Sequence, residues 1–244
     1  MFDFNTDWKT FVDTISAYLT RLTSAYVYRE TVTYTSGATF TKANYPWLTA
    51  VKVKVQGGGG GGGGAAETTS GQSSMGDGGA AGGYAEKWYL ASALNASEAV
   101  TVGAGGTGGV GDATGGTGGT SSFKLMSAQG GAGGHRRTAT NALVTSATTT
   151  GALGGIAAGG DINARGNAGI RGLIIAWGIA TGLKSGEGAA SFFGGASIAY
   201  SGTNDGAAGA APGAGGSGAV NGGASTAKTG GTGAAGIVIV ELYG

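Results

Sequence analysis

The chain lacks cysteine and is poor in proline, histidine and charge. Its 244 residues include no Cys, two Pro and one His, and Asp, Glu, Lys and Arg together make up 11%. Without cysteine no disulfide can form, and a single histidine argues against a structural zinc site. A net charge of +1 gives no electrostatic sign of nucleic-acid binding. Collagen is excluded because it needs far more proline.

An export signal and a membrane span are not apparent in the sequence. Met1 precedes acidic and aromatic residues instead of a basic segment and an apolar run. The longest apolar run, residues 173–177, is far shorter than the roughly 20 residues that cross a bilayer. We therefore expect synthesis in a cytoplasm and no embedding in a membrane.

Glycine is the abundant residue, with 57 copies. Each glycine disfavours an α-helix by about 1 kcal/mol relative to alanine. The run Gly57–Gly64 is followed by glycine pairs spaced three apart in 105–109, 115–119 and 130–134, and by single glycines at 166, 169 and 172. Three residues per turn is the period of polyproline-II-type helices, whose backbone groups bond to neighbours. Since large apolar residues look too sparse for an ordinary core, we expect a bundle of polyglycine-II helices within residues 57–244.

The N-terminal segment, residues 1–26, has a different period. Apolar residues recur at 3-4 spacing, which predicts an amphipathic helix with the seam Phe4, Trp8, Phe11, Ile15, Tyr18 and Leu22. This seam packs either on its own chain or on other chains, as an oligomeric stalk or a docking plug. The glycine-rich remainder offers little apolar surface, so we favour an intermolecular seam. Its aromatic residues are too bulky for a tight dimer, which favours a homotrimer.

Residues 27–56 are interpreted as a connector of β-strands. The run 51–56 alternates valine with lysine, and its natural partner is the segment 236–243 at the far end of the chain. If these two segments pair, the glycine-rich middle is one insertion pinned at both ends. The expected fold is thus mostly irregular and β, with an N-terminal helix, a small pinning sheet and a glycine-rich bundle.

Non-glycine inserts interrupt the bundle at 84–102, 136–150, 173–187 and 198–205. We expect them to be loops projected from a rigid scaffold, where recognition residues are common. The candidate contact residues are Arg136, Arg137, Trp177, Tyr200, Asn204 and Asp205. The arginine pair either binds a phosphate or a sugar acid, or serves solubility and local hydrogen bonding.

Signs of catalysis are missing from the sequence. His135 has no evident nucleophile or orienting partner, and the isolated aspartates lack calcium-loop spacing. GxGxxG-like strings arise by chance in such a chain and do not open a helix. We expect no enzyme activity, no cofactor and no metal.

Five segments carry a resemblance to a known family: Val51 to Gly57, Ser121 to Phe123, Gly160 to Gly169, Ala190 to Gly195 and Gly233 to Val240. Over residues 38–244 the chain resembles the glycine-rich tail-fibre and tail-tip proteins of bacteriophages. Its composition is similar to that of the adhesins at the long-fibre tips of T-even phages. The segment 173–183 departs from this pattern because it is unusually apolar.

The resemblance implies a virion protein that recognises a bacterial surface receptor, either a polysaccharide or an outer-membrane protein. It also implies attachment to other tail proteins through the N-terminus. The alternative function is a purely structural part of the tail fibre or tail.

Overall fold

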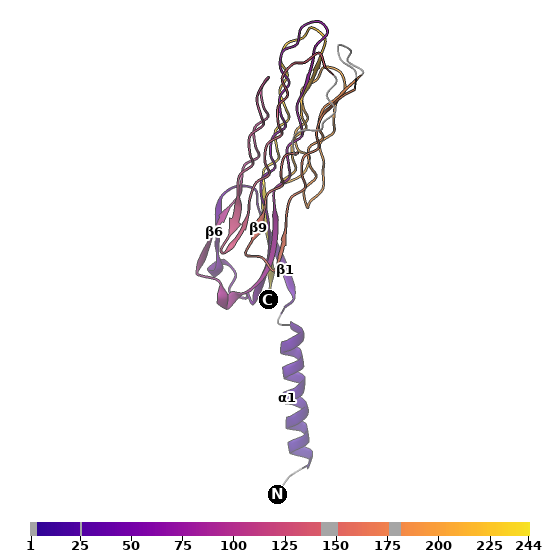
Figure 1. The fold of residues 1–244 in the computed structure, drawn as a ribbon. Helices are drawn as coiled ribbons and strands as arrows, with labels where there is room; N and C mark the ends of the chain where they lie inside the picture. Colours follow the sequence, from indigo (N-terminus) through magenta and orange to yellow (C-terminus); the bar gives the residue numbers. More distant parts are fainter. Residues whose placement is uncertain (1–3, 25, 143–150, 176–181) are drawn as a thin grey trace.

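The computed structural model describes residues 4–24, 26–142, 151–175 and 182–244. Figure 1 shows helix α1 (Phe4–Ser24) at one end of the molecule, β-strands in the middle and the glycine-rich segments at the other end. The helix predicted from the 3-4 spacing is confirmed. No helix among the described residues combines the length and the apolarity needed to cross a bilayer.

A five-stranded antiparallel sheet joins the two ends of the chain. Its strand order is β1 (Tyr28–Tyr34), β14 (Ile237–Tyr243), β3 (Ala50–Gln56), β5 (Tyr84–Leu90) and β10 (Ile162–Ala164). Strands β3 and β14 pair along their whole length, with Val53 opposite Val240. The predicted pairing of these two segments is confirmed, so the glycine-rich middle is pinned at both ends.

A second five-stranded sheet packs against the first and makes a sandwich. It contains β2 (Ala38–Thr41), β6 (Ser97–Thr101), β7 (Ser121–Phe123), β8 (Met126–Ala128) and β9 (Ala157–Ala158), with short 3-10 helices at Lys42–Asn44 and Ala91–Ala93. The core between the sheets includes Phe40, Tyr89, Phe123, Met126 and Leu242.

Large apolar residues form a side-chain core only in the sandwich, whereas the glycine-rich segments pack through their backbones. One expectation is wrong here. The segment 84–102 is not a projecting loop but contributes β5 and β6. Its Ala85 and Tyr89 alternate towards the core, which a half-buried strand requires.

The glycine run 57–64 leaves β3 and lies at the centre of the bundle. Every N–H from Gly57 to Gly64 donates to a backbone carbonyl of another segment, and the acceptor segment changes with a period of three. The acceptors lie in 77–83, 113–119 and 231–234. The carbonyls of Gly58 to Gly63 accept from three further segments, 106–109, 131–134 and 216–219. Six neighbours therefore satisfy the backbone of this one run, which meets the requirement that buried polar groups be paired.

The close approach of these backbones explains why glycine is needed. A Cβ atom on Gly61 would collide with the carbonyl oxygen of Thr107, and one on Gly62 with that of Ser217. A Cβ atom on Gly169 would likewise collide with the carbonyl oxygen of Gly78, so the contact expected there is present. Ordering glycine is entropically expensive, and the dense hydrogen bonding offsets that cost.

Side chains follow the same period of three at the bundle surface. In the segment 103–110, Gly103, Gly106 and Gly109 are buried, whereas Ala104, Thr107 and Val110 are exposed. Glycine thus faces the neighbouring backbones, and larger residues face solvent. The bundle is a backbone-packed layer structure that carries exposed side chains along its outside.

Candidate functional site

The distal end is the end of the bundle farthest from the sandwich. Because successive glycine-rich segments run away from the sandwich and then back, every second turn falls at this end (Figure 1). Short pairings there join β4 (Ser73–Met75) to β13 (Val220–Gly222) and β11 (Leu173–Ile174) to β12 (Leu183–Lys184). Isolated bridges tie the remaining turns together, for example Thr68 with Ser225 and Ser73 with Thr140.

A small apolar cluster stabilises the distal end. Met75, Ile174, Leu183 and Val220 are buried together, and Tyr200 packs against them. Part of the unusually apolar segment 173–183 is therefore core and not contact surface. Trp177 lies outside the described residues.

The candidate residues after position 199 are held by local hydrogen bonds. The backbone N–H of Tyr200 donates to Ser185 Oγ over 2.9 Å, and the residue is half-buried. Asn204 exchanges two backbone hydrogen bonds with Val220, and its side chain donates to the carbonyl of Ser201 over 2.7 Å.

Asp205 is fixed in the same way as Asn204. Its Oδ1 accepts from the backbone N–H of Thr229 over 2.7 Å. Asn204 and Asp205 thus shape the loop and also remain exposed at its surface.

The arginine pair borders a cavity with a volume of ≈ 370 Å³. Its lining is Thr114, His135, Arg136, Arg137 and Thr138. Arg136 forms an ion pair with Asp112, with 2.5 Å between nitrogen and oxygen.

Asp77 is fully buried close to the arginine pair, and its backbone N–H donates to the carbonyl of His135. Its Oδ1 accepts from the backbone N–H of Gly172 over 3.0 Å, while its Oδ2 has no hydrogen-bond partner. Burial raises the pKa of this carboxyl group, and the bond from Gly172 and the nearby cations oppose that rise only in part.

The contacts of Arg136, Arg137, Tyr200, Asn204 and Asp205 thus bring these residues to one end of the molecule. Sequence reasoning missed the other contributors to that end, namely 65–75, Asp112, Thr114 and 220–228. Successive glycine-rich segments run alternately away from the sandwich and back to it. Counting these segments along the sequence would have assigned the turns that contain these residues to the distal end. Within the described residues, His, Asp and Glu do not gather in groups of three that could hold a metal.

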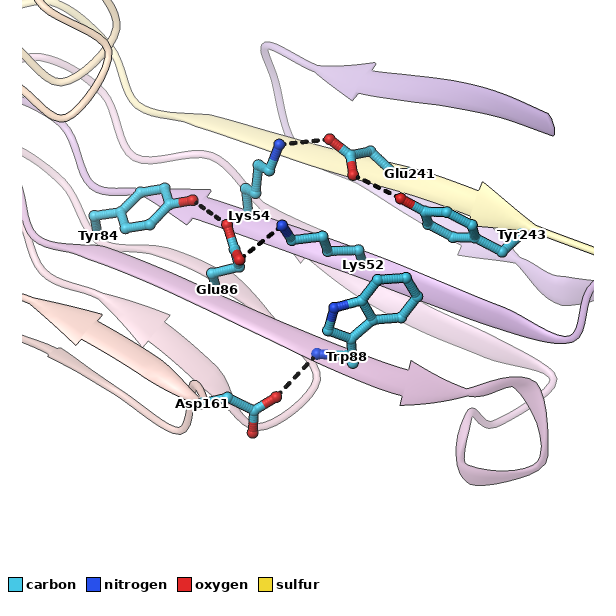
Figure 2. Close-up of polar contacts among 8 residues, drawn as sticks. All are labelled: Lys52, Lys54, Tyr84, Glu86, Trp88, Asp161, Glu241 and Tyr243. Atoms are coloured by element: carbon cyan, nitrogen blue, oxygen red, sulfur yellow. Dashed lines mark hydrogen bonds and ion pairs between the residues drawn. The ribbon is translucent and has the colours of Figure 1, made fainter. Parts of the chain in front are cut away.

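A second polar cluster lies on the first sheet, across β14, β3 and β5 (Figure 2). Lys52 Nζ lies 2.8 Å from Glu86 Oε1, and Lys54 Nζ lies 2.5 Å from Glu241 Oε1. Tyr84 and Tyr243 donate their hydroxyl protons to the same two carboxylates, over 2.7 and 3.1 Å.

Burial and hydrogen bonding together set the pKa values of this cluster. Burial opposes ionisation of Glu86, but the hydrogen bonds from Lys52 and Tyr84 outweigh it and lower its pKa. Burial, followed by the bond to Glu86, raises the pKa of Tyr84. At one edge of the sheet, Asp161 accepts from Lys87 and from the backbone of Trp88, and these bonds lower its pKa. Because the charged groups pair with one another, this network fastens neighbouring strands together.

Comparison with known proteins gives one result. Residues 34–243 match the model of a family described as a glycine-rich domain. Among curated proteins, none matches the chain. Since the family match spans most of the sequence, the protein belongs to the glycine-rich domain family.

Proposed function

We propose that this protein is a bacteriophage tail-fibre or tail-tip adhesin that binds the surface of the bacterial host during adsorption. The observation that carries the proposal is the position of the candidate loops. Helix α1 lies at one end of the molecule and the glycine-rich bundle at the other (Figure 1). Contacts of Arg136 with Gly76, and of Tyr200 with the apolar cluster around Met75, place both residues at the distal end of the bundle. A chain mounted on the virion through α1 presents these loops outwards.

The rigidity of the bundle supports a recognition role. We propose that its segments are polyglycine-II helices, because their hydrogen-bond partners and buried faces both repeat every three residues. Loops fixed on such a scaffold lose little conformational entropy when they bind. The receptor, a polysaccharide or an outer-membrane protein, would contact Arg136, Arg137, Trp177, Tyr200, Asn204 and Asp205.

The exposed stripe on α1 supports attachment to other chains. Trp8, Phe11, Ile15 and Tyr18 are all exposed, whereas the side chains of Phe4 and Leu22 lie outside the described set. A stripe of this size on a single helix is stabilised by packing against another apolar surface. We propose that it forms a trimeric coiled coil and joins the chain to other tail proteins, and several copies would add avidity.

Adsorption to host cells tests the function. Purified protein should bind host cells and compete with phage adsorption, and it should bind a non-host strain less. The double variant Trp177→Ala with Tyr200→Ala should adsorb less. The control Leu125→Ala alters an exposed residue at the sandwich and should adsorb like wild type. Equal binding of wild-type protein to both strains would instead favour a purely structural tail component.

A further inference from the structure

The cavity at the distal end has the chemistry of an anion site. Its volume of ≈ 370 Å³ lies near the lower limit for small-molecule sites. Its lining residues are Arg136, Arg137, His135, Thr114 and Thr138, whose side chains carry two guanidinium groups, an imidazole ring and two hydroxyl groups. Arginine presents a planar fork of donors that matches carboxylate and phosphate oxygens.

The backbone that carries these cations is fixed on several sides. The backbone of Arg136 forms an isolated β-bridge with that of Gly76, and the backbone of Arg137 forms one with that of Ala65. The carbonyl of His135 accepts from the N–H of Asp77 over 2.8 Å, and that of Arg137 accepts from Ser74 Oγ over 2.6 Å. The cavity is therefore held in shape by the ends of the glycine-rich segments, and binding requires little ordering of the backbone.

One carboxylate at the rim competes for the cations. Asp112 pairs with Arg136, and the two side chains are 45% and 44% exposed. An ion pair this exposed is weak because water screens it, so an incoming anion can take the place of Asp112 on the guanidinium group. The other nearby carboxyl group, on Asp77, is fully buried and is not among the residues that line the cavity.

We propose that this cavity binds an oxyanion, a phosphate or carboxylate group carried by a surface glycan of the host. The proposal rests on the adhesin function above and names the chemistry of its ligand. Arg136 is the principal ligand-binding residue, Arg137 adds positive charge, and the ring of His135 adds a hydrogen-bond donor. Asp112 competes with weaker ligands for Arg136.

Direct binding measurements test the proposal on the full chain. Inorganic phosphate and glucuronate serve as probes by titration calorimetry or NMR, with glucose as the uncharged comparison. Wild-type protein should bind at least one anion and not glucose, and the stronger of the two anions identifies the group that the glycan carries. Arg136→Gln should weaken binding by about tenfold or more, as loss of a charge-assisted bidentate contact does.

Two further variants distinguish specific anion binding in the cavity from non-specific attraction of anions to positive charge. Asp112→Asn removes the competing carboxylate and should strengthen anion binding several-fold. Lys184→Gln removes a distal cation that pairs with Glu187, and it should leave affinity unchanged. The proposal is overturned if wild-type protein binds neither anion, if Asp112→Asn does not strengthen binding, or if Lys184→Gln weakens it as much as Arg136→Gln does.

The adsorption experiment separates this proposal from the adhesin function. If the anion series behaves as expected but the protein does not adsorb to host cells, the oxyanion site stands and the adhesin function fails. If the protein adsorbs but binds neither anion, the adhesin function stands and the oxyanion site fails. Unchanged melting temperatures of the exposed-site variants exclude unfolding as the cause of a loss.

Discussion

The ammonium group of Lys54 lies 2.5 Å from a carboxylate oxygen of Glu241, although 187 residues separate them in sequence. The pair joins β3, which leads into the glycine-rich bundle, to β14, which follows it (Figure 2). The two strands close the bundle as one long insertion. Closure matters because a glycine-rich segment gains order only where neighbouring segments satisfy its backbone.

Removal of the last eight residues should open this closure. The truncated chain loses β14, the central neighbour of both β1 and β3, and we expect rapid proteolysis within residues 57–236. Limited proteolysis followed by mass spectrometry measures the effect. Deletion of residues 1–24 is the control, and the bundle should stay resistant in that variant. Equal resistance of the two truncated chains would contradict a pinning role for β14.

Substitution of Gly169 should disrupt the packing of the bundle. A Cβ at this position meets the carbonyl oxygen of Gly78, so Gly169→Val forces two backbones apart. Overpacking of this kind costs roughly 3 kcal/mol. Ala168→Val, at the exposed neighbouring position, should change the free energy of unfolding by less than about 0.5 kcal/mol. Chemical denaturation compares the two, and equal stability would show that the close contact at Gly169 is absent.

The predictable parts of the fold are the elements in which a hydrophobic repeat extends over enough residues to be recognised. Helix α1 followed from its 3-4 spacing, and β3 followed from the alternation of Val51, Val53 and Val55. Strand β9, Ala157–Ala158, consists of two alanines and carries no period at all. The second sheet, built largely from such short strands, was therefore not foreseen.

The distal site was only half predictable for a related reason. Sequence composition identifies Arg136 and Arg137 as unusual in a chain with few charges. Their proximity to Asp112 and Thr114 depends on the lengths of separate glycine-rich segments. Only matching lengths place these different turns next to one another at the distal end. That register is set by hydrogen bonds between segments, and it leaves no local mark in the sequence.

The seam on α1 should control the oligomeric state. Ile15 lies on the exposed apolar stripe, so Ile15→Asp would bury an unpaired charge if three helices pack there, at a cost of several kcal/mol. We expect a trimer for the wild-type chain and a monomer for Ile15→Asp, measured by light scattering. Ala17→Asp, two positions away and outside the seam, should remain trimeric. A monomeric wild-type chain that attaches to no other tail protein would refute the stalk.

The buried carboxyl group of Asp77 should make stability depend on pH. Burial raises its pKa above the ordinary value of 3.8, so the folded chain holds the proton more tightly than the unfolded chain does. The free energy of unfolding should therefore fall as pH rises above 3.8, until the folded pKa is passed. Asp77→Asn keeps an oxygen that can accept from Gly172 but cannot ionise, so this component of the pH dependence should disappear.

Urea denaturation from about pH 4 to about pH 7 measures this dependence, with Asp205→Asn as the control. Asp205 is exposed, and asparagine retains an acceptor for the N–H of Thr229, so the control should keep the pH profile of the wild-type chain. At neutral pH Asp77→Asn should be at least as stable as wild type, because the cost of a buried charge has been removed. A variant that is much less stable at neutral pH would mean that attraction from Arg137 and Arg171 exceeds the cost of burial. In that case the ionised carboxylate would stabilise the distal end by attracting arginine residues on other glycine-rich segments.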